Sequence, residues 1–120
     1  MFQKPSDGVS FANPDLEKAY LDLSPDSPLR KSINGLINDL KENAFCWEKI
    51  RNELIPNEYI KKYLIDNLWW YPLANGWRAV YSIISDKVEI LAVIIEYFNN
   101  KNYERRFGYW WFQKKNKREQ

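Results

Sequence analysis

Leu68-Trp69-Trp70-Tyr71-Pro72-Leu73 is followed by Ala74-Asn75-Gly76 and then by Trp77-Arg78-Ala79-Val80-Tyr81-Ser82-Ile83-Ile84. Two runs rich in aromatic and β-branched residues therefore flank Asn75-Gly76. Both of these residues accept the positive φ that a tight hairpin turn requires. The sequence predicts two antiparallel strands joined at residue 75.

A third strand is predicted after the polar break at residues 85–87. The eleven residues from Val88 to Phe98 contain too many β-branched positions to favour a helix. We therefore expect an antiparallel β-meander with strands at about 67–73, 77–84 and 88–98. The last strand is apolar at nearly every position, which is typical of a central strand covered on both faces.

Two helices are predicted before the meander. Asn13-Pro14 and Ser27-Pro28 each place a capping side chain before a proline at the first helical position. Two apolar stripes at helical spacing follow these caps: Leu16, Ala19, Tyr20 and Leu23, then Leu29, Ile33, Leu36, Ile37 and Leu40. We expect helices at 14–23 and 28–42, packed side by side on one face of the sheet. The predicted fold class is α+β, an N-terminal helical hairpin on a small antiparallel meander.

Two other segments are harder to assign. Residues 9–11 are apolar enough for a strand but very short. Between 43 and 66 four apolar residues lie at helical spacing until Pro56 ends the pattern, and 57–64 is compatible with a further short helix. The apolar residues of this pattern are Trp47, Ile50, Leu54 and Ile55.

The length of 120 residues fits one domain, which we place at 1–112, followed by a frayed basic tail at 113–120. The charge is unevenly distributed along the chain. Residues 101–120 hold seven basic and two acidic side chains, a net charge of +5, although the net charge of the whole chain is only +2. A basic end is a possible footprint for nucleic acid or an acidic partner, and it is equally compatible with a solubilising tail.

Composition excludes several kinds of chemistry. The chain has no histidine and one cysteine, Cys46, so Cys/His zinc sites, His-based triads and an intrachain disulfide are ruled out. Cys46 is expected to be a small buried hydrophobe. We expect no metal and no cofactor. Because the chain shows neither an apolar run of membrane-spanning length nor a signal-peptide core at its start, we expect a cytoplasmic protein without a membrane partner.

The order of elements resembles the RelE/ParE toxin superfamily. Gly76-Trp77-Arg78-Ala79-Val80-Tyr81 is similar to the Gly-aromatic-Arg-x-x-Tyr second strand of this family. Residues 101–109, Lys101-Asn102-Tyr103-Glu104-Arg105-Arg106-Phe107-Gly108-Tyr109, resemble the Lys-x-Tyr-Glu-x-x-Phe-Gly-Tyr close of a RelE-like branch. The resemblance covers roughly residues 27 to 109.

This resemblance implies the toxin of a type II toxin–antitoxin system, a metal-independent endoribonuclease that acts on mRNA, in some members on the ribosome. Its partners are then a cognate antitoxin and RNA. Cleavage requires activation of a ribose hydroxyl and stabilisation of phosphate charge. The implied catalytic residues are Arg78, Lys101 and Tyr103, and the implied RNA-binding residues are Arg105, Arg106, Trp70 and Tyr71.

Two departures from the family pattern leave an alternative open. The first hairpin strand has Trp69, Trp70 and Tyr71 where ribosome-dependent members have lysines, and Asn100 stands where the branch usually has histidine. The alternative is a ParE-like or catalytically silent protein of this fold that only binds a partner.

The role of Arg78 also has two interpretations. If Ile84 pairs with Val88, Arg78 opposes Ile94 and lies diagonal to Glu96 on one face, which predicts a structural ion pair. If Ser85 pairs with Val88, the two side chains lie on opposite faces and Arg78 is available for function. Most of the aromatic rings are expected in the core.

Overall fold

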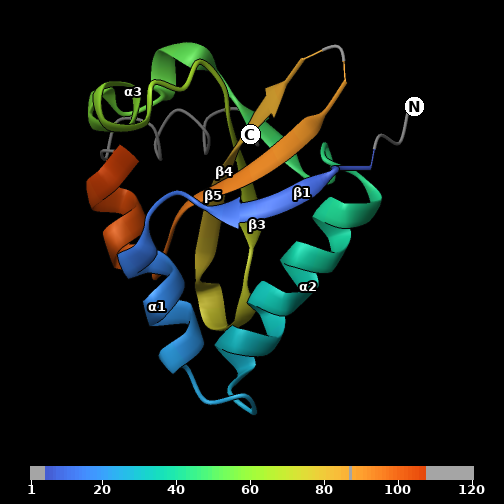
Figure 1. The fold of residues 1–120 in the computed structure, drawn as a ribbon. Coiled ribbons are helices and arrows are strands. Elements are labelled where there is room, and N and C mark those ends of the chain that lie inside the picture. Colours follow the sequence, from blue (N-terminus) through green and yellow to red (C-terminus); the bar gives the residue numbers. More distant parts are fainter. Residues whose placement is uncertain (1–4, 87, 108–120) are drawn as a thin grey trace, which may run out of the picture.

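The computed structural model describes residues 5–86 and 88–107. Figure 1 shows the arrangement of its elements along the chain. The elements in chain order are β1 (Gly8–Phe11), α1 (Pro14–Asp22), α2 (Pro28–Glu42), β2 (Glu48–Ile50), a 3₁₀ turn (Asn52–Leu54), α3 (Asn57–Tyr63), β3 (Leu68–Pro72), a second 3₁₀ turn (Ala74–Gly76), β4 (Arg78–Ser85) and β5 (Ile90–Phe98). A further helix spans 100–107.

The five strands form one sheet in the order β1-β5-β4-β3-β2. The predicted meander is confirmed in β3, β4 and β5, which pair antiparallel. The prediction of a purely antiparallel sheet is wrong, because β1 pairs with β5 in parallel. β2 adds an antiparallel strand beside β3 at the other edge. β5 is therefore an inner strand, as its continuous apolar sequence predicted.

The turn between β3 and β4 has the predicted geometry. Asn75 and Gly76 have φ values of 57° and 80°, the positive pair that a primed hairpin turn needs. The Trp77 amide donates to the Ala74 carbonyl at 3.1 Å, and the Leu73 amide donates to the Trp77 carbonyl at 2.7 Å. This turn sets the register that brings Arg78 opposite Pro72.

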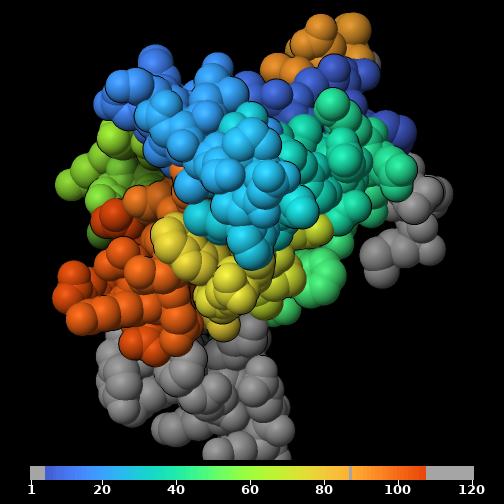
Figure 2. Space-filling view, turned by 90° about the horizontal axis from the view of Figure 1, so that it is seen from below, coloured from blue at the N-terminus to red at the C-terminus, as the bar shows by residue number. Residues whose placement is uncertain are grey.

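Both predicted helix starts are confirmed. The Asn13 side chain accepts from the Leu16 amide at 2.8 Å, and the Ser27 hydroxyl accepts from the Arg30 amide at 3.1 Å. α1 and α2 lie side by side in Figure 2, in blue and cyan, and Arg30 joins them by donating to two carbonyl oxygens at the end of α1. Their apolar residues share a core with Tyr81 and Ile94.

The opposite face of the sheet is covered as well. α3 and the helix 100–107 pack there, in a second core with inward residues of β3, β4 and β5. The aromatic residues buried in this core are Tyr59, Phe98, Tyr103 and Phe107. The helical pattern expected from Trp47 to Ile55 is wrong, because β2 and a 3₁₀ turn occupy that segment. Only the short helix expected after Pro56 forms, as α3.

A β-bulge in β5 decides which side chains face this second core. Val80 pairs with Glu96 but Tyr81 pairs with Ile94, so Ile95 is the extra residue. Ser85 pairs with Ile90 and Arg78 with Phe98, so both registers considered from the sequence are wrong. Arg78 and Glu96 nevertheless share the face that carries Val80 and Phe98, because paired residues lie on one face.

Within the described ranges, none of the helices combines the length and the apolar character needed to cross a bilayer. The predicted tail at 113–120 and the predicted domain end at 112 lie outside the described residues.

Candidate functional site

Arg78 lies between two aromatic rings on the α3 side of the sheet. Its guanidinium carbon is 5.2 Å from the ring centre of Trp70 on β3 and 4.5 Å from that of Tyr103 on the helix 100–107. Both distances are in the range of cation–π contact. The structure therefore brings together two of the three residues implied as catalytic, Arg78 and Tyr103.

Tyr103 is fully buried. Its ring stacks on Phe107 at 4.7 Å and meets Phe98 edge-on at 5.4 Å. Burial raises the pKa of the Tyr103 hydroxyl, and the neighbouring Arg78 guanidinium lowers the pKa by a smaller amount. A ring enclosed in this way has no face for a nucleobase, so this position favours a packing role over the implied catalytic one.

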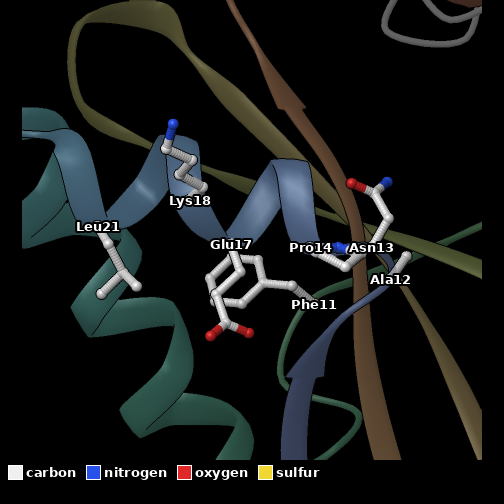
Figure 3. A pocket seen from close by; sticks show the side chains of 7 residues that line it. All are labelled: Phe11, Ala12, Asn13, Pro14, Glu17, Lys18 and Leu21. Carbon is white, nitrogen blue, oxygen red and sulfur yellow. The ribbon is translucent and has the colours of Figure 1, made fainter.

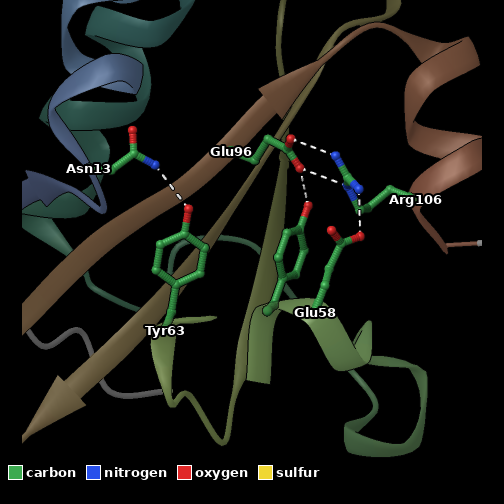
Figure 4. Close-up of polar contacts among 6 residues, drawn as sticks. Asn13, Glu58, Tyr63, Glu96 and Arg106 are labelled. Atoms are coloured by element: carbon green, nitrogen blue, oxygen red, sulfur yellow. Dashed lines mark hydrogen bonds and ion pairs between the residues drawn. The ribbon is translucent and has the colours of Figure 1, made fainter. Parts of the chain in front are cut away.

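Arg106 is engaged by carboxylates rather than directed at solvent (Figure 4). Its Nε and Nη2 donate to the two carboxylate oxygens of Glu96, both at 3.0 Å, and its Nη1 donates to Glu58 on α3. The Tyr59 hydroxyl also bonds to Glu96. The bonds to Glu96 are the largest cause of the raised Arg106 pKa. The Arg78–Glu96 pair considered from the sequence does not form, since Arg106 occupies this carboxylate.

Lys101 and Arg105 are exposed on the same helix. They are four residues apart, which places them on one helical face. Neither forms an ion pair with any residue in the described ranges. Arg105 is thus the one arginine of the helix whose charge is not neutralised by a described carboxylate.

Trp70 and Tyr71 do not form a common stacking surface. They are consecutive on β3, so their side chains point to opposite faces, and they belong to different cores. The Tyr71 hydroxyl bonds to Asp39 on α2. Trp47, the residue before β2, contacts both rings edge-on, at 6.1 and 5.7 Å between ring centres. It therefore lies at the edge of the sheet, between the two faces.

A cleft of about 520 Å³ opens where β5 meets the helix 100–107. Three residues of this cleft were not predicted from the sequence as site residues: Trp77, Tyr97 and Asn102. Nothing in their spacing marks them, because Trp77 precedes β4, Tyr97 lies on β5 and Asn102 lies on the following helix, and only the fold brings them together. The cleft is lined by Trp77, Glu96, Tyr97, Phe98, Asn102, Arg105 and Arg106.

A second, shallower hollow lies at the start of α1 (Figure 3). Phe11, Pro14 and Leu21 form its apolar part, and Glu17 and Lys18 provide one charge of each sign. Asn13 is already used there, because its oxygen caps α1 and its amide nitrogen donates to the Tyr63 hydroxyl at 2.9 Å. This hollow therefore has no surplus charge and fewer available polar groups than the cleft.

No group of three or more Cys, Asp or Glu side chains in the described part of the chain is placed to hold a metal ion. Comparisons with protein-family models, with curated proteins and with solved structures gave no match.

Proposed function

We propose that the protein is a RelE/ParE-like toxin of a type II toxin–antitoxin system that acts in the cytoplasm by binding a partner and does not cleave RNA. Two features support the toxin assignment: the motif from Gly76 to Tyr81, and a helical hairpin followed by an antiparallel meander and a closing helix. A cognate antitoxin is part of this proposal.

The observation that carries the binding role is that two of the residues implied for RNA cleavage and RNA binding, Tyr103 and Arg106, are held by contacts within the protein. Tyr103 is fully buried and Arg106 is bound by Glu96 and Glu58. Metal-independent RNA cleavage needs a group that removes the 2′-hydroxyl proton and another that protonates the leaving oxygen. The chain has no histidine to serve as either group, and the Glu96 carboxylate is already neutralised by Arg106.

The second candidate is the endoribonuclease, and one specific observation favours it. Arg78 lies directly over the Tyr103 ring, and the same helix carries the exposed Lys101 and Arg105. A rearrangement that uncovered Tyr103 would give a phosphate-binding guanidinium beside a proton donor. This candidate includes mRNA, alone or on the ribosome, as the partner.

The toxin assignment is tested by induced expression in a bacterial host. Wild-type protein is expected to arrest growth, and co-expression of the adjacent small open reading frame is expected to relieve the arrest and increase purified yield. Growth and yield that are the same with and without the neighbour would contradict the assignment. Two variants that each reverse one exposed charge serve as a matched pair in this experiment. Arg105→Glu changes the cleft, and Lys49→Glu changes a residue outside it.

A further inference from the structure

The sequence contains two Asn-Gly pairs, Asn34-Gly35 and Asn75-Gly76. An asparagine before glycine is prone to spontaneous deamidation, because glycine has no Cβ atom and its amide nitrogen can approach the asparagine side chain closely. Both asparagines are exposed, so access of water does not distinguish the two pairs. The backbone conformation around each pair does distinguish them.

Asn34-Gly35 lies inside α2, where the helix fixes the backbone. In an α-helix the amide of residue 35 donates to the carbonyl of residue 31, and the neighbouring Ile33 is buried in the core. The Asn34 side-chain oxygen also accepts a hydrogen bond from the Tyr20 hydroxyl. Attack of the Gly35 nitrogen on the Asn34 side chain would therefore require the helix to open in its middle.

Asn75-Gly76 lies in the turn between β3 and β4 and belongs to neither core. Asn75 has a φ of 57° and a ψ of 36°, and its side chain has no hydrogen-bond partner within the described ranges. A Cβ atom on Gly76 would meet no atom beyond its chain neighbours within 4 Å, so the turn has open space around it. The rotation that brings the Gly76 nitrogen to the Asn75 side chain needs only a local opening at the hairpin end, which costs less than the opening of a packed helix.

We propose that Asn75 is a site of spontaneous deamidation in the folded protein, whereas α2 protects Asn34. The Gly76 amide nitrogen attacks the side-chain carbonyl carbon of Asn75 and forms a bond to it. The bond from that carbon to the side-chain nitrogen breaks, and ammonia leaves with the proton of the Gly76 amide. Water then opens the resulting succinimide ring. Opening at the side-chain carbonyl gives aspartate, and opening at the main-chain carbonyl gives isoaspartate.

The isoaspartate product changes the hairpin. Its main chain runs through the side-chain carbon atoms and is one methylene longer, and it carries a new carboxylate. The unmodified turn sets the register in which Arg78 pairs with Pro72 and lies over the rings of Trp70 and Tyr103. Isoaspartate at position 75 is therefore expected to displace Arg78 from these rings. Aspartate also tolerates a positive φ, so it is expected to leave the turn intact.

The test incubates purified full-length protein in mildly alkaline buffer, once folded and once in concentrated urea, and locates new carboxyl groups by tandem mass spectrometry of its peptides. In the folded protein Asn75 is expected to be converted at least about tenfold faster than Asn34, because the turn opens more often than the middle of α2. In urea the two rates are expected to be similar. The mass change is independent of any binding activity, so its outcome and that of the toxin test are separate.

Equal rates at Asn75 and Asn34 in the folded protein would overturn the inference. A difference that persists unchanged in urea would also overturn it, because the neighbouring sequence and not the fold would then be the cause. The aspartate and isoaspartate forms are separated by chromatography and melted beside wild type and Asn75→Asp. The isoaspartate form is expected to melt at a lower temperature, and the aspartate form together with Asn75→Asp. Equal melting of the two forms would show that Arg78 keeps its contacts and would contradict its displacement.

Discussion

Arg106 links three elements of the fold by ion pairs. Its guanidinium joins the helix 100–107 to Glu96 on β5 and to Glu58 on α3, and about a third of the side chain is exposed, 32%. A bidentate arginine–carboxylate pair with this degree of burial is stronger than a typical surface pair, although solvent still screens part of it.

The first prediction concerns this pair. Arg106→Gln is expected to lower the free energy of unfolding by about 1 kcal/mol, because Glu96 loses its charged donors while it keeps the bond from Tyr59. The measurement is urea unfolding followed by circular dichroism. Arg51→Gln is the control, since Arg51 pairs with Glu53 at 3.6 Å in the open. Equal effects of the two changes would contradict a specific role for Arg106.

Arg78 gives the second prediction. Arg78→Ala removes contacts with two rings but leaves the Glu96 carboxylate paired with Arg106. Loss of the cation–π contacts is expected to lower the free energy of unfolding by about 1 kcal/mol. Thermal melting of wild type and variant measures it. A loss of several kcal/mol would indicate that Arg78 neutralises a buried carboxylate, as the first sequence interpretation held.

At the scale of elements, α3 ends in an unusual way. Leu64 has a positive φ of 56°, and the residue is 86% exposed. This left-handed C-cap position is commonly taken by glycine, because a Cβ atom there is crowded by the backbone. The leucine therefore contributes strain without burying its side chain.

The third prediction follows from this cap. Leu64→Gly is expected to raise the free energy of unfolding by about 0.5 kcal/mol, since the relief of strain exceeds the added entropy of the unfolded chain. Lys61→Gly, inside α3, is expected to lower it by about 1 kcal/mol. Chemical denaturation of both variants measures these shifts. Destabilisation by Leu64→Gly would show that the leucine side chain makes a stabilising contact.

The elements with a strong local signal were predictable from the sequence. The caps at Asn13 and Ser27 and the turn at Asn75-Gly76 depend on the chemistry of neighbouring residues. The strand considered at residues 9–11 forms as part of β1, but its parallel pairing with β5 was not predicted. β2 was not predicted either, because a strand of three residues is formed by pairing with β3 and carries no periodicity of its own.

The candidate site was predicted only in part, for a similar reason. Arg78 and Tyr103 were singled out and do lie together. The engagement of Arg106 by Glu96 depends on a bulge at Ile95 that adds one residue to β5. A shift of one residue exchanges the two faces of a strand, so no spacing rule in the sequence could place Glu96 against Arg106.

The whole molecule has buried phenols on both faces of the sheet. Tyr59 and Tyr103 lie in the core under α3, and Tyr81 lies in the core under α1 and α2. Burial is the largest cause that raises the pKa of each of these hydroxyls. The folded protein therefore keeps these protons at a pH where the unfolded chain loses them.

The fourth prediction is alkaline unfolding. The stabilising effect of these phenols is complete below the ordinary tyrosine pKa of about 10 and is lost as pH rises above it, because the folded state then binds more protons than the unfolded state. Absorbance of tyrosinate and far-ultraviolet circular dichroism are expected to change together above about pH 10. Full ionisation of all eight tyrosines with retained circular dichroism would contradict the burial.

We propose that the protein arrests growth by binding a partner and not by cutting RNA, and mRNA integrity during the arrest distinguishes the two mechanisms. Transcript ends are mapped by sequencing before and after induction of wild type and Arg78→Ala, with Lys49→Glu as an exposed control outside the site. A toxin that only binds its partner is expected to arrest growth with unchanged transcript ends in all three. New transcript ends that appear with wild type and Lys49→Glu, and disappear with Arg78→Ala, would contradict this proposal and establish the ribonuclease.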